Sequence, residues 1–145
     1  MSTVQELLSR KAFTDVMGVT PDTPLAEAAT TLRDRRIGIL VVRNADGDMI
    51  GVFSERDLVR AVAVRADEVV SLTVGDMLTD RVETCTYSDD LRDVVQRMGR
   101  GGFRHMPVME NGKLIGIVSI SDIFRYLMDH APQQRLDAFQ SYYCT

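Results

Sequence analysis

Hydrophobic residues recur at helical spacing in two stretches of the chain. In each stretch four apolar side chains stand at i, i+3, i+4 and i+7, which predicts a helix with one apolar face. We expect Thr23 to be the N-cap of the first helix with Pro24 at its first position, and Asp89 to cap the second. The first stretch comprises Leu25, Ala28, Ala29 and Leu32. The second comprises Leu91, Val94, Val95 and Met98, at a constant offset of 66.

Two apolar runs rich in β-branched residues follow each of these helices. Turn-forming residues separate the two runs of each pair, at 44–48 and 110–113, which is the pattern of a β-hairpin. The predicted strands are 37–42, 49–53, 106–109 and 114–118. Another helix is expected after each hairpin. Its inward residues are Leu58, Val59 and Val62 in the first copy and Ile123, Phe124 and Leu127 in the second, at an offset of 65.

This duplication predicts the organisation of the whole chain. We expect a lead-in helix at 1–12, a first repeat at 13–65, a second repeat at 72–130 and a tail at 131–145. Each repeat has the order β-α-β-β-α and is too small to bury its sheet alone. The expected fold class is therefore α/β in its α+β form, with the two repeats packed sheet to sheet about a pseudo-two-fold axis. This symmetry predicts two equivalent clefts between the repeats, where we expect a ligand to bind.

Composition narrows the classes of partner and compartment. The 145 residues are 45% hydrophobic and 26% charged, in the range of a globular domain. The formal net charge of -4 argues against a nucleic-acid or anionic-membrane surface. Cys85 and Cys144 are too few for a disulfide framework or a zinc site. With no leader-like or long apolar segment in the sequence, we expect a cytoplasmic protein.

Each hairpin leads into its second helix through the same short motif, a serine followed three residues later by an aspartate. The two copies are Ser54 with Asp57 and Ser119 with Asp122. This spacing is also the form of a capping box, in which the two side chains satisfy backbone amides at the helix start. Basic residues close to the second copy, Arg104 and His105, favour ligand binding over a duplicated cap.

At these motifs the sequence resembles the CBS-domain pair, or Bateman module, from about Thr14 to Met128. The resemblance implies a regulatory, non-catalytic domain that binds an adenine nucleotide, such as AMP, ADP, ATP, NAD(H) or S-adenosylmethionine, and that forms a disc-like homodimer. The residues that carry it are Gly51-Val52-Phe53-Ser54-Glu55-Arg56-Asp57, Gly116-Ile117-Val118-Ser119-Ile120-Ser121-Asp122, Arg104-His105-Met106-Pro107-Val108 and Asp76-Met77.

The resemblance also implies roles for individual residues. The two aspartates of the motifs would hold ribose hydroxyls, and the two serines would hold phosphate. Arg104, His105 and Arg56 would be further phosphate contacts, and the backbone at Val16-Met17 and Val82-Glu83 would flank the adenine. The full nucleotide-binding set is Asp122, Ser119, Ile120, Arg104, His105, Arg56, Asp57, Ser54, Val16, Met17, Val82 and Glu83.

The two halves differ in the cations they offer. Repeat one has Ile37-Gly38-Ile39 where repeat two has Phe103-Arg104-His105, and repeat one has Arg56 where repeat two has Ser121. We therefore expect the Asp122 site to bind a phosphorylated nucleotide more tightly than the Asp57 site, since charge-assisted hydrogen bonds contribute roughly 1.5–3 kcal/mol each.

Two other functions are compatible with the sequence. One is a structural dimerisation module whose clefts stay empty. The other is a small hydrolase that uses Ser54 or Ser119 with His105, but the chain has no Gly-x-Ser-x-Gly turn and no Walker-type loop. The leading hypothesis is a nucleotide sensor that acts on a separate, unknown protein.

Overall fold

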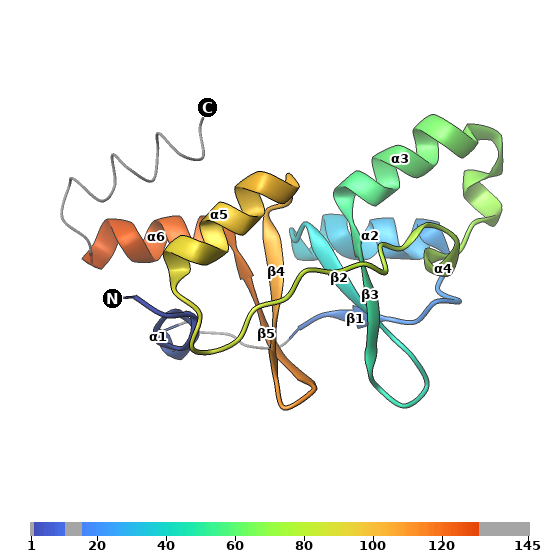
Figure 1. Cartoon of the computed structure of the whole chain (residues 1–145). Helices are drawn as coiled ribbons and strands as arrows, with labels where there is room; N and C mark the ends of the chain where they lie inside the picture. Colours follow the sequence, from blue (N-terminus) through green and yellow to red (C-terminus); the bar gives the residue numbers. More distant parts are fainter. Residues whose placement is uncertain (1, 11–15, 131–145) are drawn as a thin grey trace. The chain divides into compact units, whose positions relative to one another are not determined.

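The computed structural model describes residues 2–10 and 16–130. The expectations for the tail 131–145 and for Cys144 lie outside these residues, as do residues 13–15 of the predicted first repeat. The chain divides into two compact units. The 16–82 unit is continuous in sequence. The 83–130 unit also contains residues 2–10 (Figure 1).

The 16–82 unit is a three-stranded sheet with its helices. Strands lie in the order β1-β2-β3, with β1 parallel and β3 antiparallel to β2. Its elements are β1 (Gly18–Val19), α2 (Leu25–Arg35), β2 (Ile39–Arg43), β3 (Met49–Ser54), α3 (Glu55–Arg65), the 3-10 helix η1 (Ala66–Ser71) and α4 (Val74–Met77). Its buried core is made of Leu25, Ala28, Leu32, Leu40, Val42, Phe53, Ala61, Leu72 and Val74.

The 83–130 unit repeats this arrangement with a two-stranded antiparallel sheet. Cys85 pairs in parallel with Val108, at the place that β1 holds in the other unit. Its elements are α1 (Val4–Arg10), α5 (Leu91–Gly101), β4 (His105–Glu110), β5 (Lys113–Ser119) and α6 (Ile120–His130). Its core is made of Val4, Leu7, Leu8, Cys85, Leu91, Val94, Val95, Met98, Met106, Val108, Val118 and Ile123. The α+β class and the tandem repeat are confirmed.

Each unit is completed by a short helix that precedes the other repeat in sequence. In the 16–82 unit the segment leading into α4 docks on α2, where the Leu25 amide donates to the Leu72 carbonyl at 2.9 Å. In the 83–130 unit the segment leading into α1 docks on α5 in the same way, with the Leu91 amide donating to the Ser2 carbonyl at 2.9 Å. The lead-in helix is thus part of the second repeat's core.

A glycine allows one of these segments to approach closely. The Val52 amide donates to the Thr79 carbonyl at 2.9 Å, and the Thr79 amide donates back at 2.8 Å. A Cβ at Gly51 would stand 2.5 Å from the Thr79 carbonyl oxygen. Any side chain at Gly51 would therefore push away the residues that follow α4.

Both predicted helix caps are wrong by one residue. Pro24, not Thr23, holds the cap position of α2, because the Thr23 hydroxyl closes the turn before the helix by accepting from a backbone amide. Asp90, not Asp89, caps α5, because the Asp89 carboxylate accepts from an amide of the preceding turn. In both cases the polar side chain stabilises the turn that leads to the helix.

The predicted inward face of α3 is also wrong in part. Val59 and Val62 are 67% and 51% exposed, whereas Asp57 and Ala61 are buried. In the corresponding helix α6, Ile123 is buried as expected. Hydrophobicity alone placed the valines inside, and it does not reveal that an aspartate occupies the buried side of this helix.

Candidate functional site

The first serine–aspartate motif forms a capping box at the start of α3. Ser54 ends β3, and its hydroxyl accepts from the Asp57 amide at 3.4 Å. The Asp57 Oδ2 atom accepts from the Ser54 amide at 2.9 Å and from the Ser54 hydroxyl at 3.2 Å. The capping box that the serine–aspartate spacing allowed is therefore formed at the first motif.

The other carboxylate oxygen of Asp57 is held by two further donors. Oδ1 accepts from Arg60 at 2.9 Å and from the Thr79 hydroxyl at 3.0 Å. Arg60 also donates to the Met77 carbonyl at 3.1 Å, so the carboxylate fastens α3 to the segment around α4. Asp57 is 3% exposed. Because a carboxylate has about four acceptor positions, the donors of the protein already use its capacity.

The second motif starts α6 in the same way. The Asp122 amide donates to the Ser119 hydroxyl at 3.0 Å, and the Ser119 amide donates to Asp122 Oδ2 at 3.3 Å. The Ile120 amide donates to the Arg104 carbonyl at 2.9 Å, and His105 pairs with Ser119 across the hairpin. The fold therefore brings these five residues, all predicted for one site, to the N-terminal end of α6.

A cavity of about 450 Å³ borders Asp122 in the 83–130 unit. It lies along α1 and α6, and its polar lining includes Arg10, Arg125, Tyr126 and His130. Tyr126 stacks on His130 with ring centroids 4.6 Å apart, and the Arg10 guanidinium stands 5.8 Å from the Tyr126 centroid while contacting the His130 ring nitrogen. Sequence reasoning missed these residues, because the docking of α1 on α6 was not foreseen.

The remaining predicted residues are divided between the units. Arg56, Val16, Met17 and Val82 belong to the 16–82 unit, where the Met17 carbonyl accepts from the Val41 amide at 3.0 Å. Glu83 begins the 83–130 unit. The joint contribution of both groups to one site stays a prediction.

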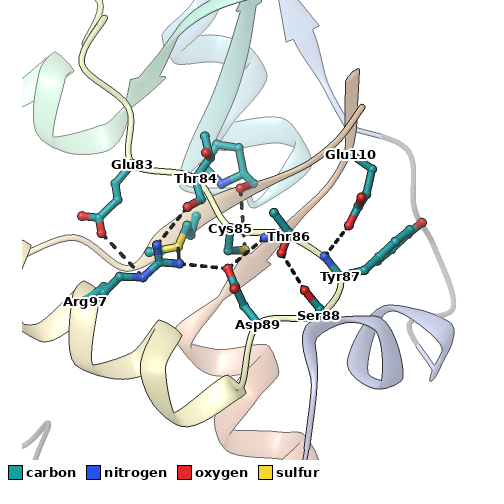
Figure 2. A network of polar contacts seen from close by, with 11 residues as sticks. Glu83, Thr84, Cys85, Thr86, Tyr87, Ser88, Asp89, Arg97 and Glu110 are labelled. Atoms are coloured by element: carbon teal, nitrogen blue, oxygen red, sulfur yellow. Dashed lines mark hydrogen bonds and ion pairs between the residues drawn. The ribbon is translucent and has the colours of Figure 1, made fainter. Parts of the chain in front are cut away.

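Around Glu83 the chain is fastened to α5 by one arginine. Figure 2 shows Arg97 reaching from α5 to the segment of residues 83–89. Its guanidinium lies 3.6 Å from the Glu83 carboxylate and 3.4 Å from the Asp89 carboxylate, and it donates to the Thr84 carbonyl at 3.1 Å. It also donates to the Met106 sulfur at 3.2 Å. This cluster fixes the course of the segment on which the adenine was predicted to rest.

Cys85 lies in the same segment, but it is an inert thiol in chemical terms. Burial raises its pKa to about 12, and the nearby Asp89 carboxylate raises it further than the Arg97 guanidinium lowers it. At neutral pH the thiol is therefore protonated. Its side chain fills the core between the segment and β4.

The family model for the CBS domain matches the chain twice, at residues 4–64 and 74–129. The chain belongs to the CBS-domain family. The match includes both serine–aspartate motifs and both hairpins, so the resemblance inferred from the sequence is confirmed.

Relatives of this CBS-domain pair include proteins of several sizes. A 17.7 kDa protein of Acidianus ambivalens is 37% identical over 123 residues, which are 84% of this chain and 73% of that protein. The human 5'-AMP-activated protein kinase subunit gamma-3 is 29% identical over 133 residues, which are 87% of this chain. The chain spans only 27% of that subunit's length.

Solved structures show the same fold. A CBS-domain-containing protein from Agrobacterium tumefaciens is 42% identical with a TM-score of 0.83, and the match covers 86% of this chain and 98% of that one. The CBS-domain pair of protein MJ0100, solved in complex with 5'-methylthioadenosine and S-adenosyl-L-methionine, is 21% identical with a TM-score of 0.72, and the match covers 88% and 97% of the two chains.

Two kinds of site are not found in the part of the chain that the structure covers. Within residues 2–10 and 16–130, no three His, Cys, Asp or Glu side chains are grouped so that they could hold a metal ion. Over the same ranges, every helix is too short or too polar to cross a membrane.

Proposed function

We propose that this protein is a cytoplasmic, non-catalytic regulatory module that binds an adenine nucleotide, AMP, ATP or NAD(H), at the Asp122 motif and passes the occupied state on to a partner protein. The observation that carries this proposal is the gathering of Ser119, Asp122, Arg104 and His105 at the N-terminal end of α6, where Asp122 borders a cavity. The kinase subunit named for 5'-AMP and the adenosine ligands of the MJ0100 complex support the ligand class.

The chemistry of the site suits the parts of a nucleotide. A carboxylate such as that of Asp122 accepts hydrogen bonds from both hydroxyls of a ribose cis-diol. The start of α6 offers the positive end of a helix dipole to a phosphate, and the Ser119 hydroxyl has a proton to donate to it. Arg104 adds a guanidinium, which binds phosphate through two parallel hydrogen bonds. The ribose and the phosphate of a nucleotide would thus have binding partners at the same end of α6.

We propose that the Asp57 motif is the weaker site. A ribose at Asp57 would have to displace Arg60 and the Thr79 hydroxyl, which the carboxylate already binds. Asp122 is less buried and borders a cavity. This supports the ranking of the two sites on grounds independent of the count of nearby cations.

Isothermal titration calorimetry with AMP, ATP and NAD(H) tests the proposal. At least one of them is expected to give saturable heat with one tight site per chain, and to raise the melting temperature, because a ligand of the native state shifts the unfolding equilibrium. A protein that shows neither heat nor a thermal shift with any of the three would instead be a structural dimerisation module.

We further propose that the protein is a homodimer whose contact includes α3. Val59, Val62 and Val64 are 67%, 51% and 72% exposed, and Val70 on η1 is 91% exposed. Exposed apolar side chains on two successive elements are typical of an interaction surface. Val59→Glu is expected to convert a dimer to a monomer in sedimentation velocity. A wild-type protein that sediments as a monomer would contradict the homodimer.

A further inference from the structure

The segment of residues 83–89 is held from its side chains and from its backbone. Arg97 contacts the carboxylates of Glu83 and Asp89 and the carbonyl oxygen of Thr84 (Figure 2). At the far end of the segment, the Tyr87 amide donates to Glu110 at 2.7 Å. The backbone of Cys85 pairs with β4 through the Pro107 carbonyl and the Met109 amide, and Arg97 on α5 holds the residues just before it, Glu83 and Thr84.

Within residues 16–82, the positions that correspond to this cluster do not form one. At an offset of 66, Arg97 corresponds to Thr31, Glu83 to Met17 and Asp89 to Thr23. The Thr31 hydroxyl donates to a carbonyl of its own helix at 3.1 Å. The repeated fold forms in both halves, so the fold itself does not require the arginine. The cluster is a feature of one repeat, and it lies where that repeat carries a residue predicted to flank the base.

We propose that Arg97 is a positioning residue for the base of the bound nucleotide. By fixing Glu83 and the Thr84 carbonyl, it sets the backbone at Glu83 so that its polar groups face the Watson–Crick edge of adenine. Arg97 itself does not touch the ligand. This inference rests on the proposed function. The new element is that the site selects adenine over other purines.

The Arg97 guanidinium neutralises two carboxylates, and this is the physical reason for its effect on the segment. Without Arg97, two carboxylates and a carbonyl oxygen would face one another without a cation between them, and the segment would move to separate them. Adenine and hypoxanthine differ only at the 6-position and in the protonation of N1, so their edges exchange a donor and an acceptor. A displaced backbone loses the ability to tell them apart, while ribose and phosphate contacts at Asp122 and Ser119 persist.

The test compares the affinities for AMP and inosine monophosphate in the full-length protein. We expect the wild type to prefer AMP by about tenfold or more, which is the discrimination that one hydrogen-bond mismatch provides. Arg97→Met keeps the apolar stem but removes every donor, and the preference should fall to about twofold. Arg97→Lys retains the charge and should restore part of it. Arg100→Met, on the exposed end of the same helix, is the matched control and should keep the wild-type ratio.

The ratio separates positioning from general damage, because a loosened fold weakens both nucleotides alike. An unchanged ratio in Arg97→Met, or an equal loss of both affinities, would overturn the role of Arg97 while leaving the proposed function intact. A wild type that binds neither AMP nor inosine monophosphate would overturn the role of Arg97, and the proposed function would fall with it only if ATP and NAD(H) also fail to bind.

Discussion

The two serine–aspartate motifs have the same local geometry and different surroundings. Both form a capping box at the start of a helix. Asp57 is enclosed by Arg60 and Thr79, whereas Asp122 borders a cavity. One and two turns after the aspartate, α3 carries small or apolar residues and α6 carries different ones. Ala61 and Val64 correspond to Tyr126 and Asp129. The motif determines the helix start, and the residues around it determine whether a ligand has room.

The largest expected difference between the two motifs is in stability. Asp57→Ala removes a helix cap and leaves Arg60 and Thr79 without their acceptor, so the free energy of unfolding should fall by about 3 kcal/mol. Asp122→Ala should cost less, about 1 kcal/mol, because this aspartate is less buried than Asp57. Urea unfolding followed by circular dichroism measures both. Equal losses would mean that the two aspartates have the same structural role.

The next effect is on ligand affinity, and it has the opposite order. Asp122→Asn keeps an oxygen for the cap but loses the charge that binds the ribose hydroxyls, so AMP affinity should fall by about a hundredfold. Asp57→Asn is the matched control and should change the affinity of the tight site by less than about threefold. Calorimetry gives both values. A greater loss in Asp57→Asn would reverse the ranking of the sites.

The smallest expected effect is a pH dependence of the free energy of unfolding caused by Cys85. This residue lies in the segment of residues 83–89, which Arg97 holds in the second repeat. Cys85 has a pKa of about 12 in the folded protein, raised from 9.0, so between these values the unfolded chain loses the thiol proton first. Stability is therefore fully present below pH 9 and falls as the pH rises towards 12. From pH 8 to pH 10 we expect a loss of about 1 kcal/mol.

Cys85→Val provides the control for this pH dependence, since valine is the corresponding residue, Val19, of the first repeat. The variant should lose that part of the dependence while its core remains filled. An identical decline of stability in the variant and the wild type would show that the Cys85 thiol does not titrate on unfolding in this range.

The sequence predicted the repeated elements well, because their signals are local. The apolar periodicity of Leu25–Arg35 and Leu91–Gly101 and the turn at Asn111 and Gly112, both with positive φ, are encoded within a few residues. The surroundings of Asp57 were not predictable in this way. Thr79 stands 22 residues away along the chain and reaches the carboxylate only because the segment after α4 docks on β3.

The cavity beside Asp122 was missed for the same reason. It depends on α1, whose sequence shows an amphipathic helix but contains no sign of its docking partner. The prediction for the valines of α3 failed in the opposite way, because it assigned burial to exposed residues. Hydrophobicity was interpreted as burial, whereas Val59 and Val62 are exposed and the buried side of the helix carries Asp57. A pattern within one element does not specify what lies opposite that element.

The placement of α1 on the second repeat affects the order in which the protein assembles during synthesis. Residues 2–10 leave the ribosome before the first repeat, yet Leu91, to which Ser2 binds, is made much later. The 16–82 unit has all its parts as soon as Val82 is complete, so it is able to fold while translation continues. The second repeat must instead close a loop across the entire first repeat, which makes it the late and slow step of folding.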